Sequence, residues 1–325
     1  MNNTPSNYYS LRQLEWTLGF KRDVLQDMAR QAGKYYRPYD EKQVKKNGKV
    51  KIRHIDNPLR KLKFIQKRIL KRVLSEHMKQ LPHGMVGGVP GKSIIDNAKP
   101  HINQEMVVTI DLKNCFPNTK ASNIFLVWRD IVGYGTRQAN LLTQLTTFRT
   151  ILPQGAPTSS ALCNLVLLSL YKEIQTYADK NGLNLSTNYV DDFTLSGRAN
   201  VVRPAIRFVI KRIQHYGFAV RRIKVVVMPA HKNQKTTGLL LNKKVNVARK
   251  RIEETRNKIF AIKKRATGIT EKEQRSIEGD ILFVKKVSKE KAEKLKKLVN
   301  EVLPTNLIPE FETSKPERWS CRHHK

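Results

Sequence analysis

Two adjacent aspartates, Asp191 and Asp192, interrupt a run of β-forming residues at positions 188–196. The residues on either side, 189–190 and 193–195, predict two strand halves, so the aspartates are expected to form the tight turn of a hairpin. A hairpin tip that presents carboxylates can hold a hard cation such as Mg²⁺, which prefers oxygen ligands. Aspartate pairs are also common in ordinary turns, so the pair alone leaves both interpretations open.

A third carboxylate, Asp111, follows the apolar and β-branched run at 106–110, which predicts a buried strand. A carboxylate at the end of a buried strand is costly unless it is paired or metal-bound, although it could also simply cap a helix or a turn. Placed beside the hairpin, Asp111 would complete a site for two Mg²⁺ ions, with Mn²⁺ as a substitute. Such a pair of ions can activate a primer hydroxyl and stabilise a leaving pyrophosphate. The carboxylates therefore predict nucleotidyl transfer. Apart from the metal ions, this reaction requires of the protein mainly positioning and charge compensation.

The chain is strongly basic, with 62 Lys and Arg against 27 Asp and Glu and a net charge of +35. The charge is concentrated: residues 34–79 contain 16 basic and 4 acidic residues, and residues 243–297 contain 19 and 8. Nucleic acid is the expected partner, bound through many phosphate contacts. An anionic membrane surface is the alternative, but the basic helices lack the Trp and Phe faces that membrane binding requires.

The 325 residues suffice for two or three packed subdomains. No uncharged apolar run is long enough to span a membrane, and the polar N-terminus does not resemble a signal peptide. Cys115, Cys163 and Cys321 are widely separated, which favours neither a disulfide framework nor a zinc site. A cytoplasmic location is therefore expected.

Apolar periodicity predicts the elements that would position the carboxylates. We expect a helical pair at 10–30 broken near Gly19, two strands around an Asn47-Gly48 turn, and a basic helix at 59–73. The Gly-rich segment at 83–93 could be a phosphate-binding loop or a flexible connection. Further helices are expected at 124–132, 139–148, 158–177 and 204–216, strands at 218–220 and 224–227, and three basic helices within 247–302.

Four motifs in collinear order resemble those of reverse transcriptases: Asp111, Leu-Pro-Gln-Gly at 152–155, Tyr-Val-Asp-Asp at 189–192, and the segment 217–224. The resemblance runs from about residue 51 to residue 302. It implies an α+β, right-hand polymerase fold with fingers, a palm whose antiparallel sheet packs on helices, and a helical thumb. The implied boundaries are an N-terminal helical segment at 1–34, fingers at 35–105 and 121–165, palm at 106–120 and 166–234, thumb at 235–303 and a basic tail at 304–325.

The resemblance also implies roles for individual residues. The catalytic residues would be Asp111, Asp191 and Asp192, and the metal site would comprise Asp111, Leu112, Asp191 and Asp192. The nucleotide would be bound by Arg53, Phe116, Gln154 and Lys224. Phe116 matches an aromatic gate against the ribose 2′-hydroxyl, although it could also be a core aromatic. Lys224 matches a lysine that assists the leaving pyrophosphate, in a segment that departs from the usual Asn…Lys-Thr pattern.

Two shorter motifs resemble those of bacterial retron reverse transcriptases. Residues 97–101 match Asn-Ala-x-x-His, and Thr236-Thr237-Gly238 stands where these enzymes carry Val-Thr-Gly. The Gly-rich loop departs from the family, because Gly87-Gly88-Val89 looks like an insertion. The residues expected to contact RNA are Asn97, His101, Thr236, Thr237, Gly238, Arg249, Lys250 and Arg251.

The retron resemblance implies a structured noncoding RNA that serves as template and, through a guanosine 2′-hydroxyl, as primer. The product would be msDNA, a branched RNA linked to single-stranded DNA and made from dNTPs. The resemblance further implies a role in antiviral defence against phage, with a separate effector protein, and removal of the template by a host ribonuclease H. The alternatives are a group II intron-like or other defence-associated reverse transcriptase, or a non-catalytic RNA-binding protein.

Overall fold

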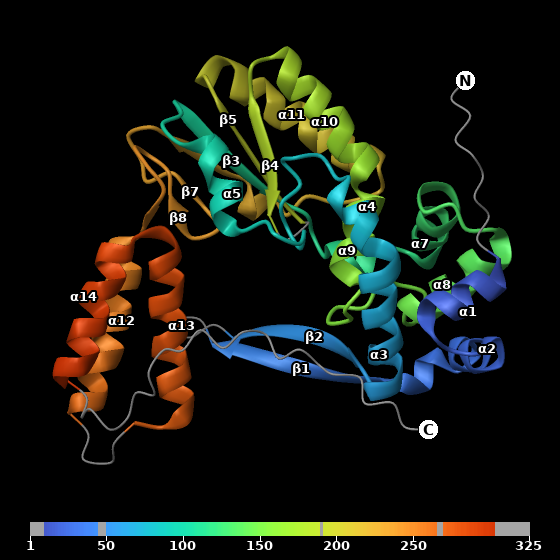
Figure 1. Ribbon diagram of the computed structural model, residues 1–325. Coiled ribbons are helices and arrows are strands. Elements are labelled where there is room, and N and C mark those ends of the chain that lie inside the picture. Colours follow the sequence, from blue (N-terminus) through green and yellow to red (C-terminus); the bar gives the residue numbers. More distant parts are fainter. Residues whose placement is uncertain (1–9, 45–49, 189–190, 265–268, 303–325) are drawn as a thin grey trace. The chain divides into compact units, whose positions relative to one another are not determined.

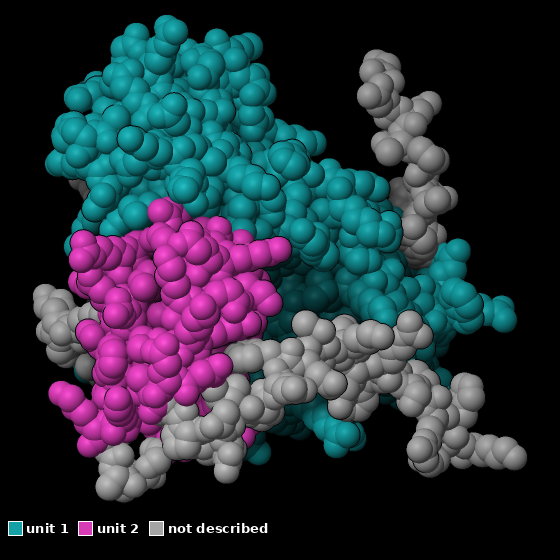
Figure 2. Space-filling view, turned by 60° about the vertical axis from the view of Figure 1, so that its left-hand side comes forward, with its two compact units in different colours: residues 1–245 teal, residues 246–325 magenta. Residues whose placement is uncertain are grey.

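The computed structural model of the chain describes residues 10–44, 50–188, 191–264 and 269–302. It divides into two compact units, Met1–Val245 and Asn246–Lys325, which Figure 2 distinguishes by colour. The division into fingers and palm within the first unit stays a prediction. No described helix combines the length and apolar character needed to cross a bilayer.

The first unit begins with the predicted helical pair, α1 (Leu11–Leu18) and α2 (Arg22–Arg30). The Ser10 hydroxyl accepts from the Gln13 amide in a capping box, which starts α1. Gly19 ends α1 in the left-handed conformation, at φ 67°, which is favourable for glycine. A short 3₁₀ turn, η1 (Ala32–Tyr35), leads onward, and α2 packs on α8 (Thr136–Thr146).

A long hairpin follows, formed by β1 (Tyr36–Val44) and β2 (Val50–Pro58) in antiparallel register. The predicted Asn47-Gly48 turn lies outside the described residues. The basic helix is α3 (Arg60–Ile69), which continues through one π-helical turn, η2 (Leu70–Leu74), into α4 (Ser75–Lys79). Its buried face carries Leu62, Ile65 and Ile69, as the apolar periodicity predicts.

The central element is a four-stranded antiparallel sheet in the order β4 (Asn184–Asn188), β5 (Asp192–Gly197), β3 (Met106–Asp111) and β6 (Val226–Pro229). Helices α10 (Leu168–Lys180) and α11 (Ala199–His215) pack on the sheet, as Figure 1 shows. Side chains alternate between the two faces of a strand. On β5, therefore, Phe193 and Leu195 face the apolar core, while Thr194 and Ser196 lie on the other face. That second face is met by α5 (Ile94–Ala98) and η3 (Lys99–His101).

Several boundaries differ from the sequence-based expectation. The helix expected at 158–177 is two helices, α9 (Ser159–Val166) and α10, separated at Leu167. α11 begins at Ala199, five residues before Pro204, and so contains this proline. A proline inside a helix removes one backbone hydrogen bond, and the packing of the helix offsets that loss. The strand expected at 218–220 is absent among the described residues, where Val220 forms a single bridge to Leu112. The expectation that Asp191 and Asp192 together form the hairpin turn is wrong for Asp192, which is the first residue of β5 and pairs with Asn188 at the end of β4. Residues 189–190, expected as a strand half, lie outside the described residues.

Shorter elements complete the first unit. They are α6 (Cys115–Asn118), α7 (Ala121–Leu126), the π-helical η4 (Val127–Ile131), the 3₁₀ turn η5 (Arg222–Lys224), β7 (Lys235–Thr236) and β8 (Leu239–Leu240).

The second unit contains the short strand β9 (Asn246–Val247) and the three basic helices that the sequence predicts, α12 (Arg249–Lys263), α13 (Glu271–Val287) and α14 (Lys289–Val302). Its separate core includes Ile259, Ile281 and Leu295, all nearly inaccessible. Thr270 starts α13 with a capping box to Glu273. Each unit therefore has its own apolar core.

Candidate active site

The register of the sheet places Asp111 beside the acidic pair. Asp111, the last residue of β3, is the antiparallel partner of Asp192, the first residue of β5. The Leu112 amide donates to the Asp191 carbonyl at 2.7 Å, so the chain after β3 is also tied to the turn. Carboxylates 80 residues apart in sequence thus converge at one end of the sheet.

Two cations accompany these carboxylates. The Lys224 ammonium forms an ion pair with Asp111 Oδ1, and Arg221 Nε lies 3.7 Å from Asp111 Oδ2. The Arg221 amide also donates to the Asp111 carbonyl at 2.9 Å, which holds this segment against the end of β3. Arg221 was not among the predicted site residues. Its proximity to Lys224 in sequence was the only signal for it.

The acidic pair carries negative charge that its surroundings do not fully compensate. Burial, together with the charge of Asp111, raises the pKa of Asp191 to about 6. Burial and the charges of Asp191 and Asp111 raise the pKa of Asp192 to about 7. Among the described residues, no group of three or more His, Cys, Asp or Glu side chains is arranged as a metal site. The donor set nevertheless fits a hard divalent cation, because it consists of carboxylate oxygens whose negative charge is not fully balanced by the neighbouring cations.

Two cysteines that are distant in sequence contact each other, and one of them, Cys115, lies near enough to Asp191 and Asp111 to be affected by their charge. Cys115 and Cys163 are free and buried, with their sulfur atoms 3.2 Å apart. The contact with Cys163, burial and the nearby charges of Asp191 and Asp111 raise the pKa of the Cys115 thiol. Next to Cys115, Phe116 is half-buried and packs against the main core. The position of its ring is consistent with core packing, and its role as a gate stays a prediction.

The hairpin β1–β2 meets the loop that carries Gln154. The Asp56 amide of β2 donates to the Gln154 carbonyl at 2.8 Å. Gly155, at φ 118°, lies so close to Ile55 that a Cβ would stand 2.9 Å from its Cγ2. Arg53 is exposed on the same strand. In the described part of the chain, no hydrogen bond or ion pair links Arg53 or Gln154 to the three aspartates, so their nucleotide-binding roles stay predictions.

On the polar face of the sheet, a buried chain of hydrogen bonds includes three of the residues expected to contact RNA. His101 lies between Ser196 of β5 and Ser186 of β4, with each ring nitrogen 2.7 Å from a hydroxyl. Ser186 donates to the Asn97 side-chain oxygen at 3.0 Å, and Asn97 Nδ2 donates to Thr236 Oγ1 at 3.0 Å. All of these side chains are buried.

The hydrogen-bond directions assign the tautomer of His101. Because the Ser186 hydroxyl donates to Asn97, it accepts from His101 Nε2, and His101 Nδ1 then accepts from Ser196. A neutral ring is what this pattern requires, and burial lowers the pKa of His101 to about 3. Thr236 closes the chain with a 2.9 Å contact to Thr194. These side chains bond to the protein itself, so an RNA-binding role would act through the surface that they support.

The Thr-Thr-Gly motif forms a tight turn. Thr237 and Gly238 connect β7 and β8, and both have positive φ, 52° and 79°. Two positive φ angles match the backbone twist of a hairpin, which explains a glycine at the second position. The motif therefore presents a rigid hairpin tip, with Thr236 anchored beneath it.

The Gly-rich segment at 83–93 is held by its own contacts. The Lys92 ammonium donates to the carbonyls of His83 at 2.8 Å and Met85 at 3.1 Å. The Gly87 carbonyl accepts from Asn164 of α9 at 2.8 Å. The loop is therefore neither a flexible connection nor a phosphate cradle built on Lys92, because that ammonium is used internally.

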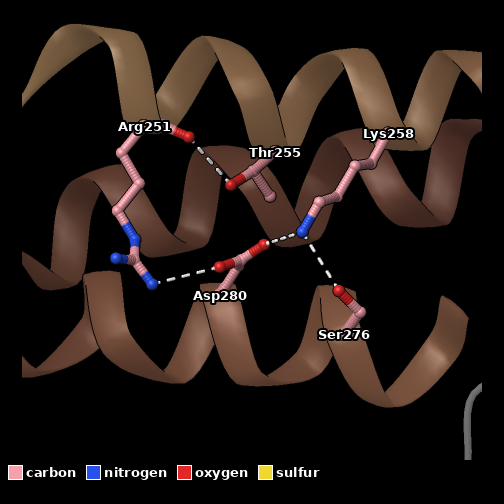
Figure 3. Close-up of polar contacts among 5 residues, drawn as sticks. All are labelled: Arg251, Thr255, Lys258, Ser276 and Asp280. Atoms are coloured by element: carbon pink, nitrogen blue, oxygen red, sulfur yellow. Dashed lines mark hydrogen bonds and ion pairs between the residues drawn. The ribbon is translucent and has the colours of Figure 1, made fainter. Parts of the chain in front are cut away.

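In the second unit, the predicted RNA-binding run at 249–251 divides into different environments. Lys250 is exposed, and Arg249 is exposed and pairs with Glu253 at 2.8 Å. Arg251 instead donates to Asp280 at 3.2 Å, and its guanidinium lies 3.8 Å from the centroid of the Phe283 ring. Figure 3 shows Arg251 and Lys258 of α12 converging on Asp280 of α13. Arg251 thus joins two helices, whereas Arg249 and Lys250 lie on the surface.

The comparison with protein families agrees with this arrangement. Residues 44–246 match the family model described as "Reverse transcriptase (RNA-dependent DNA polymerase)". The chain therefore belongs to the reverse transcriptases, and its mixed helix-and-sheet structure is consistent with their right-hand polymerase fold.

Within that family the chain is of the retron type. It is 34% identical over 220 residues to the Retron Ec86 reverse transcriptase of Escherichia coli, covering 67% of this chain and 68% of the relative. It is 31% identical over 273 residues to the Retron Mx65 reverse transcriptase of Myxococcus xanthus, covering 77% of this chain and 61% of the relative. Among solved structures, a telomerase from Candida albicans aligns at a TM-score of 0.47 and 11% identity, over 88% of this chain and 61% of that chain.

The neutral state of His101 predicts a pH dependence of stability. Between about pH 6.5 and pH 3 the unfolded chain takes up a proton at this residue and the native chain does not. Stability from His101 is therefore complete above pH 6.5 and is lost as the pH falls, by about 1.4 kcal/mol per pH unit. Between pH 6 and pH 4.5 the free energy of unfolding, measured by urea denaturation, should fall less steeply in His101→Gln than in the wild type. The exposed His215→Gln is the matched control, and equal slopes in His101→Gln and the wild type would contradict the assignment.

Proposed function

We propose that this chain synthesises DNA on an RNA template at the centre formed by Asp111, Asp191 and Asp192. The observation that carries the proposal is the strand register that sets Asp111 opposite Asp192, with Lys224 paired to Asp111. Three carboxylates and two cations at one end of a sheet suit phosphoryl transfer, in which positioning and charge compensation dominate.

The carboxylates are proposed to bind two Mg²⁺ ions, with Leu112 supplying backbone oxygen beside them. When bound, divalent ions lower the pKa of a primer hydroxyl and stabilise the charge on the leaving pyrophosphate. Lys224 and Arg221 lie within reach of the same space and are proposed to exchange their contact with Asp111 for the phosphates of an incoming dNTP. Reverse transcriptases generally use divalent metals, and the raised pKa values of Asp191 and Asp192 support such a role here.

Further residues are proposed to hold the nucleotide. Phe116 would lie against the deoxyribose, where a ring leaves no room for a 2′-hydroxyl. Gln154 and Arg53 would contact the nucleotide from the fingers, and the bond between Asp56 and Gln154 supports this because it holds the two segments together.

The RNA partner is proposed to be a cognate structured noncoding RNA that provides both template and primer through a 2′-hydroxyl. The membership in retron-type enzymes and the net charge of +35 support this partner. Exposed cations such as Arg249 and Lys250, and the rigid Thr237-Gly238 tip, are proposed to contact its backbone and shape. A cytoplasmic role in defence against phage, with a separate effector protein and a host ribonuclease H, is proposed on the same membership.

The catalytic assignment predicts that Asp192→Asn loses DNA synthesis by at least about a hundredfold while RNA affinity stays within about twofold. The amide keeps the shape of the side chain but removes the charge that would bind a cation, and phosphate gripping uses other residues. Primer extension and RNA binding are measured on the same preparation. Asp179→Asn, an exposed change on α10, is the matched control. Primer extension by Asp192→Asn at the wild-type rate would contradict the proposal.

The gate assignment predicts that Phe116→Ala incorporates ribonucleotides more readily, by about tenfold or more relative to deoxynucleotides. Removing the ring opens space where the 2′-hydroxyl would lie. Single-nucleotide extension with each sugar gives the ratio of the two kcat/KM values. An unchanged ratio would favour the purely core-packing interpretation of this ring.

The retron assignment predicts the nucleic acid that co-purifies with the chain. A branched RNA joined through a 2′-hydroxyl to single-stranded DNA is expected, and debranching enzyme should separate the two parts. Sequencing identifies the RNA. Unbranched or random cDNA would instead favour an intron-like or other defence-associated reverse transcriptase.

A further inference from the structure

Helix α2 is flanked by two pockets that no step of the proposed polymerisation uses. One, of about 540 Å³, lies between α2 and α8, which pack together in the first unit. The other, of about 870 Å³, lies between α2 and α3. Arg30, at the end of α2, lines both. The two pockets therefore adjoin at Arg30.

The pocket between α2 and α8 is cationic. Arg22, Gln26 and Arg30 recur every four residues and so share one face of α2. The residues facing them from α8 are Arg137, Asn140 and Gln144. No carboxylate lines this pocket, and among the described residues none of its three arginines forms an ion pair. Guanidinium groups that form no ion pair, together with side-chain amides, suit the oxygens of phosphate.

The pocket between α2 and α3 is mainly apolar and aromatic. Its walls include Phe20, Val24, Tyr35 and Phe64, and Phe64 is 49% exposed. The cationic residues Arg60 and Lys61 belong to the same lining. Asp23 and Asp27 are also present, and their carboxylates can accept hydrogen bonds from the amino groups of a base. An exposed aromatic wall with cations beside it is the arrangement on which unpaired bases stack.

The aromatic wall is held in place before any ligand binds. The Arg68 guanidinium lies 5.1 Å from the Phe20 ring centroid and 4.6 Å from that of Phe64. Arg68 also donates to the carbonyls of Leu18 and Gly19, the latter at 3.2 Å. A Cβ at Gly19 would meet the Arg68 guanidinium, and the positive φ of this residue also favours glycine. Preorganisation of this kind reduces the entropy lost on binding.

We propose that these two pockets bind an unpaired segment of RNA, with a base in the aromatic pocket and its neighbouring phosphates in the arginine–amide pocket. Unlike an acidic peptide, single-stranded RNA has both the polyanionic backbone and the planar rings that the two pockets require. The choice of RNA as partner rests on the proposed function. The site itself does not, because none of its residues belongs to the aspartate centre.

The test is binding of a fluorescent single-stranded RNA of mixed sequence, without dNTPs or divalent metal. Arg22→Gln combined with Arg137→Gln should weaken binding by about tenfold. Because each phosphate contact contributes about 0.7 to the slope of log affinity against log salt concentration, the loss of two contacts should reduce the steepness of that slope by about 1.4. Arg203→Gln combined with Arg207→Gln removes the same charge from the exposed face of α11 and should change affinity by less than about twofold. Equal losses in the two double variants would overturn the proposal.

The aromatic pocket is tested separately. Phe64→Ala should weaken binding by at least about fivefold with an unchanged salt slope, because stacking releases no counterions. Phe64→Tyr keeps the ring and should retain the affinity. No loss in Phe64→Ala, or displacement of the RNA by polyglutamate as readily as by unlabelled RNA, would overturn the assignment of the ligand. Since the assay contains no dNTPs, binding here can succeed or fail independently of DNA synthesis.

Discussion

The antiparallel pairing of β3 with β5 brings the three aspartates together. It sets Asp111 opposite Asp192, and like charges directly opposite each other weaken a strand pair. The apolar partners Val108–Leu195 and Ile110–Phe193, buried on one face, hold the register against this repulsion. Apolar packing along the strands therefore offsets the repulsion between the two carboxylates at their ends. Such a locally unfavourable arrangement is expected where a site binds a cation.

The other face of the sheet is held by directional hydrogen bonds instead of apolar packing. Ser196, His101, Ser186, Asn97 and Thr236 form one continuous chain that joins β5, η3, β4, α5 and β7. A shift of one residue in a strand would turn these hydroxyls to the wrong face and leave buried polar groups without partners. The network therefore specifies the same register that the apolar face stabilises. It also connects that register to the hairpin at Thr237-Gly238.

The large positive charge is divided between structural and exposed groups. Lys92 and Arg68 donate to backbone carbonyls within the first unit, and Arg251 and Lys258 neutralise Asp280 in the second. Arg22 and Arg137 lie instead in a pocket that contains no carboxylate. A basic segment is thus not by itself a binding surface. The cations available to a polyanion are those that the fold leaves without an internal acceptor.

Local patterns in the amino-acid sequence predict the buried strand before Asp111, the helical pair broken at Gly19, and the three basic helices of the second unit. They also predict a hairpin at the acidic pair, although Asp192 is the first residue of β5 and not a turn residue. These features depend on local periodicity and turn chemistry, which neighbouring residues decide. Three features appear only in the folded chain: Arg221 joins Lys224 at Asp111, Cys115 contacts Cys163, and Asn97 and His101 are buried. Periodicity shows that a face is covered but not what covers it, because partners distant in sequence are selected by strand register and helix packing.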